Sequence, residues 1–335
     1  MTQSLPVHAE YPLATVRILF QGDGREPIAC IPQSRRYTAG RLHMLRTPHH
    51  SQRIRSAIAR FAVCLIALLT LIPNAKSLSQ TDNVFSTIEE IQSEFDSVPC
   101  RRQDRLPAVR ALFQKMGAKP EELTSQKRGT AENLVVLRPS VQPGEDTVVI
   151  GAHYDFVGGG CGAIDNWSGI VALAHLYRTI GHFTPRKNIL FVAFDREEEG
   201  LVGSGNMARA IKKEEIPHYC AMINIDSFGL AGPFALSNTS SASLVRLSEE
   251  VAATLQIPFY RVSIGNADAD SSSFLSKKIP AVTLSGLSKD WDSILHTNND
   301  QAAKVQPGSV HLGYRLALSL WERIDEAPCD AFRDR

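Results

Sequence analysis

The sequence lacks several signatures that would place it in a common class of enzyme. It has no G-x-S-x-G segment, which marks the nucleophile of many serine hydrolases, and no H-E-x-x-H segment, which marks many zinc proteases. None of its six cysteines forms a C-x-x-C pair, so a cysteine-rich zinc site is not expected. The net charge is only +1, and beyond residue 60 the 32 acidic residues outnumber the 27 basic ones. The charge therefore excludes a general basic surface for nucleic acid.

The sequence also lacks an apolar run long enough to cross a bilayer comfortably, for which about 20 residues are needed. Its run at 61–73, FAVCLIALLTLIP, follows a basic stretch ending at Arg60 and precedes a small-x-small triplet at 75–77. These features together are typical of a secretory signal peptide, or of an anchor if the segment is retained. We therefore expect residues 1–82 to be a leader, with the true start at the first residue or at Met44, and the protein to be secreted or periplasmic. A buried core helix is the alternative interpretation of the run.

Four cysteines lie beyond the expected leader: Cys100, Cys161, Cys220 and Cys329. An even number of cysteines in an oxidising compartment is compatible with disulfide bonds. Four cysteines allow three connectivities, and the sequence does not choose among them. We expect Cys161 to be a loop residue or a disulfide partner rather than a metal ligand.

Beyond residue 82 the sequence alternates between two kinds of segment. Apolar, β-branched segments predict strands at 133–139, 146–155, 188–195, 221–228 and 280–286. Helical periodicity or composition predicts helices at 83–98, 106–117, 165–180, 202–213, 242–256 and 307–324, and residues 118–132 are expected to form a polar linker. This alternation predicts an α/β fold, a three-layer α/β/α sandwich with a mostly parallel central sheet, in a single domain over residues 83–328.

Ionisable residues follow the expected strands at the point where each strand ends. They are His153, Asp155, Asp195, Glu197, Glu198 and Asp226, joined by Asp165 at the start of a helix and His296 in the loop after the last strand. In a parallel sheet these positions meet at one edge, where binding sites form. Taken singly, each has an ordinary interpretation as a helix cap, a solvated charge, a turn residue or a surface histidine.

Two imidazoles and several carboxylates are expected at one edge, where the uncompensated charges of the carboxylates would repel one another unless cations neutralised them. Nitrogen and oxygen ligands without a thiolate suit zinc first, with manganese or cobalt as alternatives. We therefore expect two divalent cations per chain. The glycine-rich loop at 158–160 is then expected to let the chain turn toward Asp165 without crowding the metals, rather than to hold a phosphate.

Five ordered motifs, GAHYD, GAIDNWSG, EEEGLVGS, NID and HTNND, resemble the co-catalytic dizinc exopeptidases of the bacterial leucyl aminopeptidase type, which are also related to glutaminyl cyclases. The resemblance covers roughly residues 120–325 and implies the zinc-peptidase, phosphorylase/hydrolase-like fold. It implies the following roles: His153 and Asp226 bind one zinc ion, Glu198 and His296 bind the other, Asp165 bridges the two, Asp155 orients His153, and Glu197 is the general base.

The function that the resemblance implies is a zinc-dependent aminopeptidase. It would hydrolyse the amino-terminal residue from peptides with a free N-terminus, using a metal-bridged water from which Glu197 takes a proton. Neither nucleic acid nor a membrane is an expected partner, except through an uncleaved leader. Two positions depart from the family pattern: Ser271 replaces a usual histidine and Ser227 a frequent methionine.

Three alternatives stay open. The first is a glutaminyl cyclase, which uses one zinc ion on the same fold, and the second is a carboxypeptidase-like enzyme. The third is a tethered binding protein that has lost the chemistry, although every ligand position and Glu197 are present in this sequence.

Overall fold

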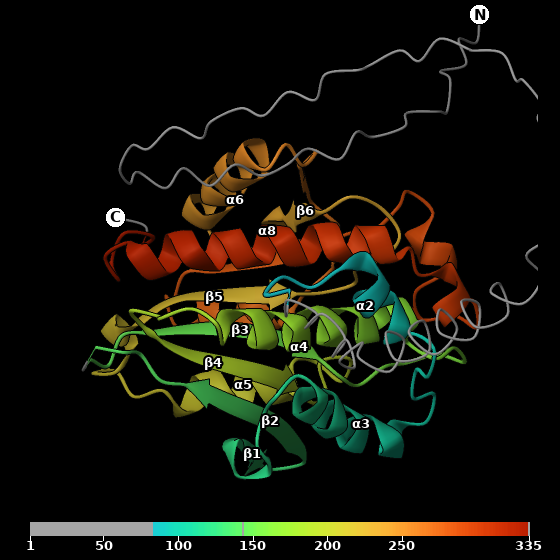
Figure 1. Ribbon diagram of the computed structural model, residues 1–335, viewed down its shortest axis with the longest axis horizontal. Coiled ribbons are helices and arrows are strands. Elements are labelled where there is room, and N and C mark those ends of the chain that lie inside the picture. Colours follow the sequence, from blue (N-terminus) through green and yellow to red (C-terminus); the bar gives the residue numbers. More distant parts are fainter. Residues whose placement is uncertain (1–82, 143, 334–335) are drawn as a thin grey trace, which may run out of the picture. The chain divides into compact units, whose positions relative to one another are not determined.

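The computed structural model of the protein describes residues 83–142 and 144–333 (Figure 1). The expected leader, with its apolar run at 61–73 and Met44, lies outside these residues. Among the helices of the described residues, none is long and apolar enough to span a bilayer. The domain boundaries at residues 83 and 328 stay a prediction.

The described residues form one mixed sheet of eight strands. Its spatial order is β1-β2-β4-β3-β5-β8-β6-β7. The strands are β1 (Leu123–Arg128), β2 (Ala131–Arg138), β3 (Thr147–His153), β4 (Asn188–Phe194), β5 (Tyr219–Ile225), β6 (Phe234–Leu236), β7 (Tyr260–Val262) and β8 (Ala281–Ser285). The four central strands β4, β3, β5 and β8 are parallel, and antiparallel pairs occur only toward the two edges.

Helices cover both faces of this sheet. The helices are α2 (Ile88–Ser93), α3 (Arg102–Lys115), α4 (Ser168–Ile180), α5 (Val202–Ala210), α6 (Ala242–Thr254), α7 (Asp270–Leu275) and α8 (Pro307–Glu326). On one face α4 and α8 lie side by side over the central strands, with α3 against α4 and α6 against α8 (Figure 1). On the other face α5 packs against α7. The predicted three-layer α/β/α fold is therefore confirmed.

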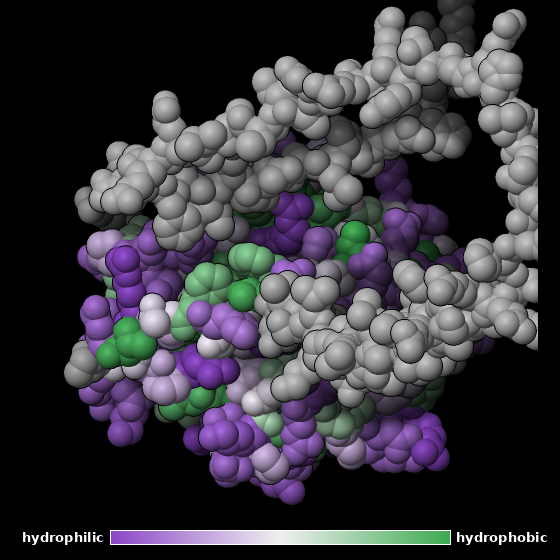
Figure 2. Space-filling view, in the orientation of Figure 1, coloured by the Kyte–Doolittle hydropathy of each residue, from purple (hydrophilic) through white to green (hydrophobic). Residues whose placement is uncertain are grey.

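Burial explains why the central strands are apolar throughout. Every residue of β3 is buried, because both faces of a central strand are covered by helices. On the face seen in Figure 2, hydrophobic residues lie in small groups among hydrophilic ones on the part not drawn in grey. Several large apolar side chains, such as Val141 and Tyr260, are exposed, as is common on protein surfaces.

Two expectations about the amino-terminal part of the domain were wrong. Residues 118–132 are not a linker, because they contain β1, an exposed edge strand paired antiparallel with β2. The helix expected at 83–98 is limited to α2, which begins after Thr87; this residue and Glu90 form reciprocal hydrogen bonds at the helix start.

The four cysteines of the described domain form two disulfide bonds. Cys220 pairs with Cys329 and joins the start of β5 to the segment after α8. Cys100 pairs with Cys161 and joins the segment before α3 to the glycine-rich loop after β3. The second bond therefore reaches the edge of the sheet where the ionisable residues were expected.

Candidate metal centre and active site

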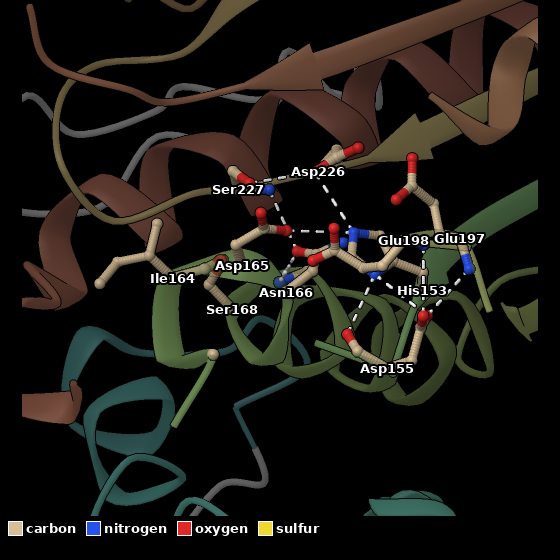
Figure 3. A network of polar contacts seen from close by, with 12 residues as sticks. His153, Asp155, Ile164, Asp165, Asn166, Ser168, Glu197, Glu198, Asp226 and Ser227 are labelled. Atoms are coloured by element: carbon tan, nitrogen blue, oxygen red, sulfur yellow. Dashed lines mark hydrogen bonds and ion pairs between the residues drawn. The ribbon is translucent and has the colours of Figure 1, made fainter. Parts of the chain in front are cut away.

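The parallel strands bring the predicted side chains to one edge of the sheet. His153 is the last residue of β3, and Asp226 follows the last residue of β5. The Nε2 atom of His153 lies 3.1 Å from Oδ1 of Asp165 and 3.6 Å from Oδ1 of Asp226. Figure 3 shows these three side chains coming from separate elements and meeting at a common centre. They form the first of two donor sets.

The second donor set lies on the other side of Asp165. Nε2 of His296 lies 3.0 Å from Oδ2 of Asp165 and 3.1 Å from Oε2 of Glu198. The two oxygens of Asp165 therefore face different histidines. Asp165 and Glu198 are nearly buried, whereas the side chain of His296 is 53% exposed.

Asp155 links the first donor set to the glutamate pair. Its Oδ1 accepts a hydrogen bond from the backbone N–H of Glu197 at 3.0 Å, and its Oδ2 accepts one from that of Glu198 at 3.2 Å. Oδ1 also lies 3.5 Å from Nδ1 of His153. The hydrogen-bond partner of this Nδ1 is the backbone carbonyl of Asp155 at 3.2 Å, so the residue holds the loop after β4 through its carboxylate and contacts the imidazole through both its backbone and its side chain.

The charges of this centre favour a bound cation. Burial opposes the charged form of His153, but the charge of Glu197 and hydrogen bonds to neighbouring aspartates outweigh it and raise its pKa. Hydrogen bonds to Asp165 and Glu198 raise the pKa of His296 to about 10. Burial opposes the ionised form of Asp165, but its contacts with both imidazoles prevail and lower its pKa. The imidazoles therefore tend to bind protons, whose positive charge balances the carboxylates in the place that a metal cation would take.

Glu197 belongs to neither donor set. It is partly buried in the loop after β4, and desolvation raises its pKa well above the ordinary value, with Asp226 and Asp270 adding to the effect against the opposing charge of His153. A carboxyl group with a raised pKa, beside a metal centre but outside its ligands, is suited to accept and return a proton.

The donor atoms fit a zinc centre. One oxygen of the nearly buried Glu198, Oε1, has no hydrogen-bond partner among the described residues, so a lone pair is free for a ligand. His153, Asp165 and Glu198 each place one ligand atom within 4.8 Å of the others. Imidazole nitrogens and carboxylate oxygens are ordinary zinc ligands, and no cysteine sulfur lies among them.

The backbone around Asp165 differs from the expected helix start. Residues Ala163–Trp167 form a single π-helical turn in which Asp165 and Asn166 have non-helical torsion angles, and α4 begins only at Ser168. The N-cap residue Trp167 provides no side-chain cap, and the side-chain oxygen of Asn166 instead accepts the N–H of Gly169 in the first turn at 2.9 Å. Asp165 therefore lies in a turn before α4 rather than at the start of the helix itself.

Two residues that sequence reasoning left without a role shape this turn. The carboxylate of Asp300 accepts hydrogen bonds from the backbone N–H groups of Ile164 at 2.7 Å and Asp165 at 3.1 Å. Asn166 donates to the carbonyl of Ile225 at 2.9 Å, and its side-chain oxygen accepts the N–H of Ser227 at 3.1 Å. Both lie inside motifs already singled out, HTNND and GAIDNWSG, so their motif membership was the available signal.

The glycine-rich loop has a more specific reason for its composition than the turn expected of it. A Cβ atom added at Gly158 or Gly160 would collide with the backbone carbonyl of His296 or Thr297, respectively. Gly158 also has a φ of +81°, which favours glycine. The loop can therefore pack directly on the segment that carries His296.

Three other polar residues of the sequence analysis lie outside the donor sets. The carboxylate of Asp195 accepts the N–H of Glu132 at 2.8 Å and so secures β2 instead of joining the centre. Ser271, at the usual histidine position, is fully buried and donates to the carbonyl of Thr239 at 2.7 Å. Cys161 is a disulfide partner, which is one of the two roles expected of it.

A pocket of about 530 Å³ opens onto both donor sets and Glu197. Its apolar lining includes Leu236, Ile264, Leu287, Trp291 and Leu295. Among the described residues that line the pocket, none is lysine or arginine. The pocket therefore offers a ligand an apolar surface and carboxylates, without the permanent positive charge of a lysine or arginine side chain.

Comparison with known proteins identifies a family and several relatives that match part of this chain. The model of the family described as peptidase family M28 matches residues 133–320. A probable zinc metalloprotease of Pyrenophora tritici-repentis is 32% identical over 108 residues, 29% of this chain and 25% of the relative. Aminopeptidase YwaD of Bacillus subtilis is 31% identical over 120 residues, 32% of this chain and 26% of the relative. These matches span about a quarter of each relative's length.

A solved structure shares the fold at low sequence identity. The glutaminyl cyclase of an Acidobacteriales bacterium has a TM-score of 0.61 and 15% identity, covering 71% of this chain and 94% of the cyclase. At this identity the likeness concerns the fold alone.

Proposed function

The chain belongs to peptidase family M28, and from this premise we propose that it is a zinc-dependent aminopeptidase that binds two zinc ions. The observation that carries the proposal is the division of the Asp165 carboxylate between two donor sets, one with His153 and one with His296. The names of the two curated relatives support the zinc and the aminopeptidase activity.

The residues at the centre have distinct parts in the proposed reaction. His153, Asp165 and Asp226 would hold one zinc ion, and Asp165, Glu198 and His296 the other. When bound, zinc ions polarise a carbonyl group and lower the pKa of water from 15.7 to about 7.

Glu197 is the proton carrier of the proposed mechanism. Its carboxylate takes a proton from the attacking water and later delivers it to the departing amine. The hydrogen bond from its backbone N–H to Asp155 holds it beside the centre, while its side chain remains free for this transfer. Asp155 supports the reaction by holding both His153 and the Glu197 backbone.

The pocket supports an amino-terminal rather than a carboxy-terminal exopeptidase. Recognition of a substrate's terminal carboxylate ordinarily uses an arginine or lysine, and the described lining contains neither. Besides the proposed metal ligands, Glu197 and Asp268 line the pocket, and their carboxylates are available as hydrogen-bond acceptors for a free amino group. The apolar lining would contact the side chain of the first substrate residue.

The glutaminyl cyclase alternative shares the fold, so the fold does not discriminate. Two complete donor sets sharing Asp165 favour the two-metal hydrolase over a one-zinc enzyme. The presence of Glu197 beside both sets favours an enzyme over a binding protein.

Hydrolysis of aminoacyl-anilides by the purified protein tests the proposal. The assay compares the zinc-depleted protein, the zinc-restored protein and the N-acetylated form of each substrate. We expect cleavage of free-amine substrates only, restored by zinc. Cyclisation of an amino-terminal glutamine without anilide cleavage would instead identify a cyclase. Zinc binding without either reaction would contradict the proposed activity.

A further inference from the structure

A buried arginine lies behind the metal centre and belongs to none of the motifs. Arg105 is on α3, which precedes the part of the chain matched by the family model, and it is fully buried. Its guanidinium lies over the ring of Phe156 at 4.5 Å and over that of Trp167 at 5.3 Å. Burying a charged group is costly unless its surroundings compensate for lost water. The position therefore requires an explanation beyond packing.

The guanidinium binds the backbone just before the bridging residue. Its Nη2 donates to the carbonyl of Gly162 at 3.0 Å and also to the carbonyl of Cys161. Asp300 binds the N–H groups of the same stretch as an acceptor. Its carboxylate accepts the N–H of Asp165, and its backbone carbonyl accepts the N–H of Cys161 at 2.7 Å. Carbonyl groups and N–H groups of residues 161–165 are thus held by two buried side chains of opposite charge.

The charge of Arg105 also compensates the carboxylates of this region. Burial lowers its pKa to about 10, while the nearby charges of Asp300, Asp155 and Asp165 act in the opposite direction. The group therefore stays charged at neutral pH. In the described residues no carboxylate lies within ion-pair distance of it, so it acts on the carboxylates through space while its hydrogen bonds go to the backbone.

We propose that Arg105 is a positioning residue for the metal centre, which fixes residues 161–165 so that the two oxygens of Asp165 face His153 and His296. The proposal rests on the proposed function of this site as a zinc centre. The guanidinium is needed because it lies over two aromatic rings while its Nη2 donates to two adjacent carbonyls, and the compact ammonium of lysine does not reproduce the contact with the rings.

A covalent bond ties the same two segments together. Cys100 lies five residues before Arg105 in the chain, and its disulfide bond to Cys161 attaches this segment to the same loop that Arg105 contacts. Because this bond remains when Arg105 is replaced, the loop stays attached to the segment before α3. Substitution of Arg105 therefore tests the fine position of the loop rather than its attachment.

The test measures zinc affinity in Arg105→Gln and Arg105→Lys by competition with a chromophoric chelator, using the full protein well below its unfolding midpoint. We expect both variants to bind zinc about 10- to 100-fold more weakly, the range seen when partners of metal ligands are removed. The visible spectrum of the cobalt-substituted protein should change as well, since it reports the ligand geometry.

A matched control separates this role from the general loss of a stacked arginine. Arg138 lies over the ring of Tyr177 at 4.6 Å, at the end of β2 that is remote from the metal centre. Arg138→Gln should leave zinc affinity and the cobalt spectrum unchanged. If Arg105→Gln behaved in the same way, with only a lower unfolding temperature, the proposal would be overturned.

A milder variant covers the case in which Arg105→Gln does not fold. Phe156→Leu keeps the guanidinium but removes one of its two stacking rings, and we expect it to weaken zinc binding by a factor of about 3 to 10. Unchanged zinc affinity in this variant would also overturn the proposal. If the unaltered protein bound no zinc, the proposed function itself would fail, whereas zinc binding by all variants alike would remove only the role of Arg105.

Discussion

Two clusters of this molecule combine histidine with carboxylates, and the pKa values of their histidines are shifted in opposite directions. In the interior cluster, around α4, His175 lies 2.8 Å from the hydroxyl of Ser86 and near Glu94. Burial lowers the pKa of His175 to about 3, with the charge of Arg178 adding to the effect. At the metal centre the histidine pKa values are raised instead.

The difference lies in the supply of permanent cations. In the interior cluster Arg178 pairs with Glu90 at 2.7 Å and Lys115 with Glu94 at 2.7 Å, so the carboxylates are neutralised and the histidine stays uncharged. At the metal centre, the ion pairs of Asp165 and Glu198 within the described residues are with histidine only. A cluster whose carboxylates already pair with arginine and lysine stabilises the fold. A cluster whose carboxylates have no such partners is suited to bind a metal cation.

The largest expected effect separates reactivity from metal binding within the metal centre. Glu197→Gln keeps the shape of the side chain but removes the proton carrier, so hydrolysis should fall by about 10²- to 10⁴-fold while zinc affinity stays the same. Steady-state cleavage of an aminoacyl-anilide and chelator competition measure the two quantities.

The neighbouring Glu199 supplies the control for this variant. It is exposed and pairs with Arg196 at 2.6 Å, so Glu199→Gln should retain full activity. Near-parental hydrolysis by Glu197→Gln would show that another group carries the proton.

The second effect concerns the carboxylates that support each cluster. Asp155→Asn replaces an acceptor of two backbone N–H groups with a side chain that has one acceptor oxygen, and it should weaken zinc binding about 10- to 100-fold. Glu94→Gln in the interior cluster should leave zinc affinity unchanged. Equal effects of the two substitutions would remove the distinction between the clusters.

The third effect is the pH dependence of zinc binding. Zinc binds the neutral imidazole, and the raised pKa of His296, about 10, means that a proton must leave at neutral pH. Affinity should therefore rise with pH by about tenfold per unit for each proton displaced. Calorimetry in buffers of different ionisation enthalpy counts the released protons, and zinc binding without proton release near neutral pH would contradict the described electrostatics.

The smallest effect belongs to the interior cluster. The folded-state pKa of His175 is lowered to about 3, below an unfolded value of about 6.5, so between these values the unfolded chain binds the extra proton. Stability should accordingly fall with decreasing pH in this window, by up to about 1.4 kcal/mol per pH unit from this group.

Replacement of this histidine isolates its contribution. Urea unfolding of His175→Gln at neutral and mildly acidic pH should show a weaker pH dependence than the unaltered protein, while exposed His182→Gln should show no change. An identical pH dependence in His175→Gln would mean that other groups dominate acid unfolding.

Much of the metal centre could be predicted because it depends on strand ends. The apolar runs identified the central parallel strands, and the parallel arrangement then placed His153, Glu198 and Asp226 at one edge. The resemblance of the five ordered motifs to a known family then indicated which of these residues belong to the same donor set. The edge strand β1 escaped prediction because its exposed position needs no apolar pattern, and its sequence, LTSQKR, is polar.

The support of the centre was less accessible to sequence reasoning. The turn at Asp165 is set by Asp300, which lies 135 residues away, and by Asn166, whose partner is on β5. Arg105 contacts backbone carbonyls 56 and 57 residues away. Backbone partners leave no pattern in a single sequence, and a helical arginine is ordinarily interpreted as solvated.

The shared carboxylate of Asp165 has a consequence for how such centres change during evolution. In the proposed two-metal centre, a mutation of His296 or Glu198 would disrupt one donor set but leave His153, Asp165 and Asp226 in place, so a lineage could pass from two metal ions to one without losing metal binding. A mutation of Asp165 removes a ligand from both sets in a single step. Selection should therefore hold Asp165 most strictly, while the unshared ligands offer the route by which a descendant enzyme acquires a one-metal chemistry.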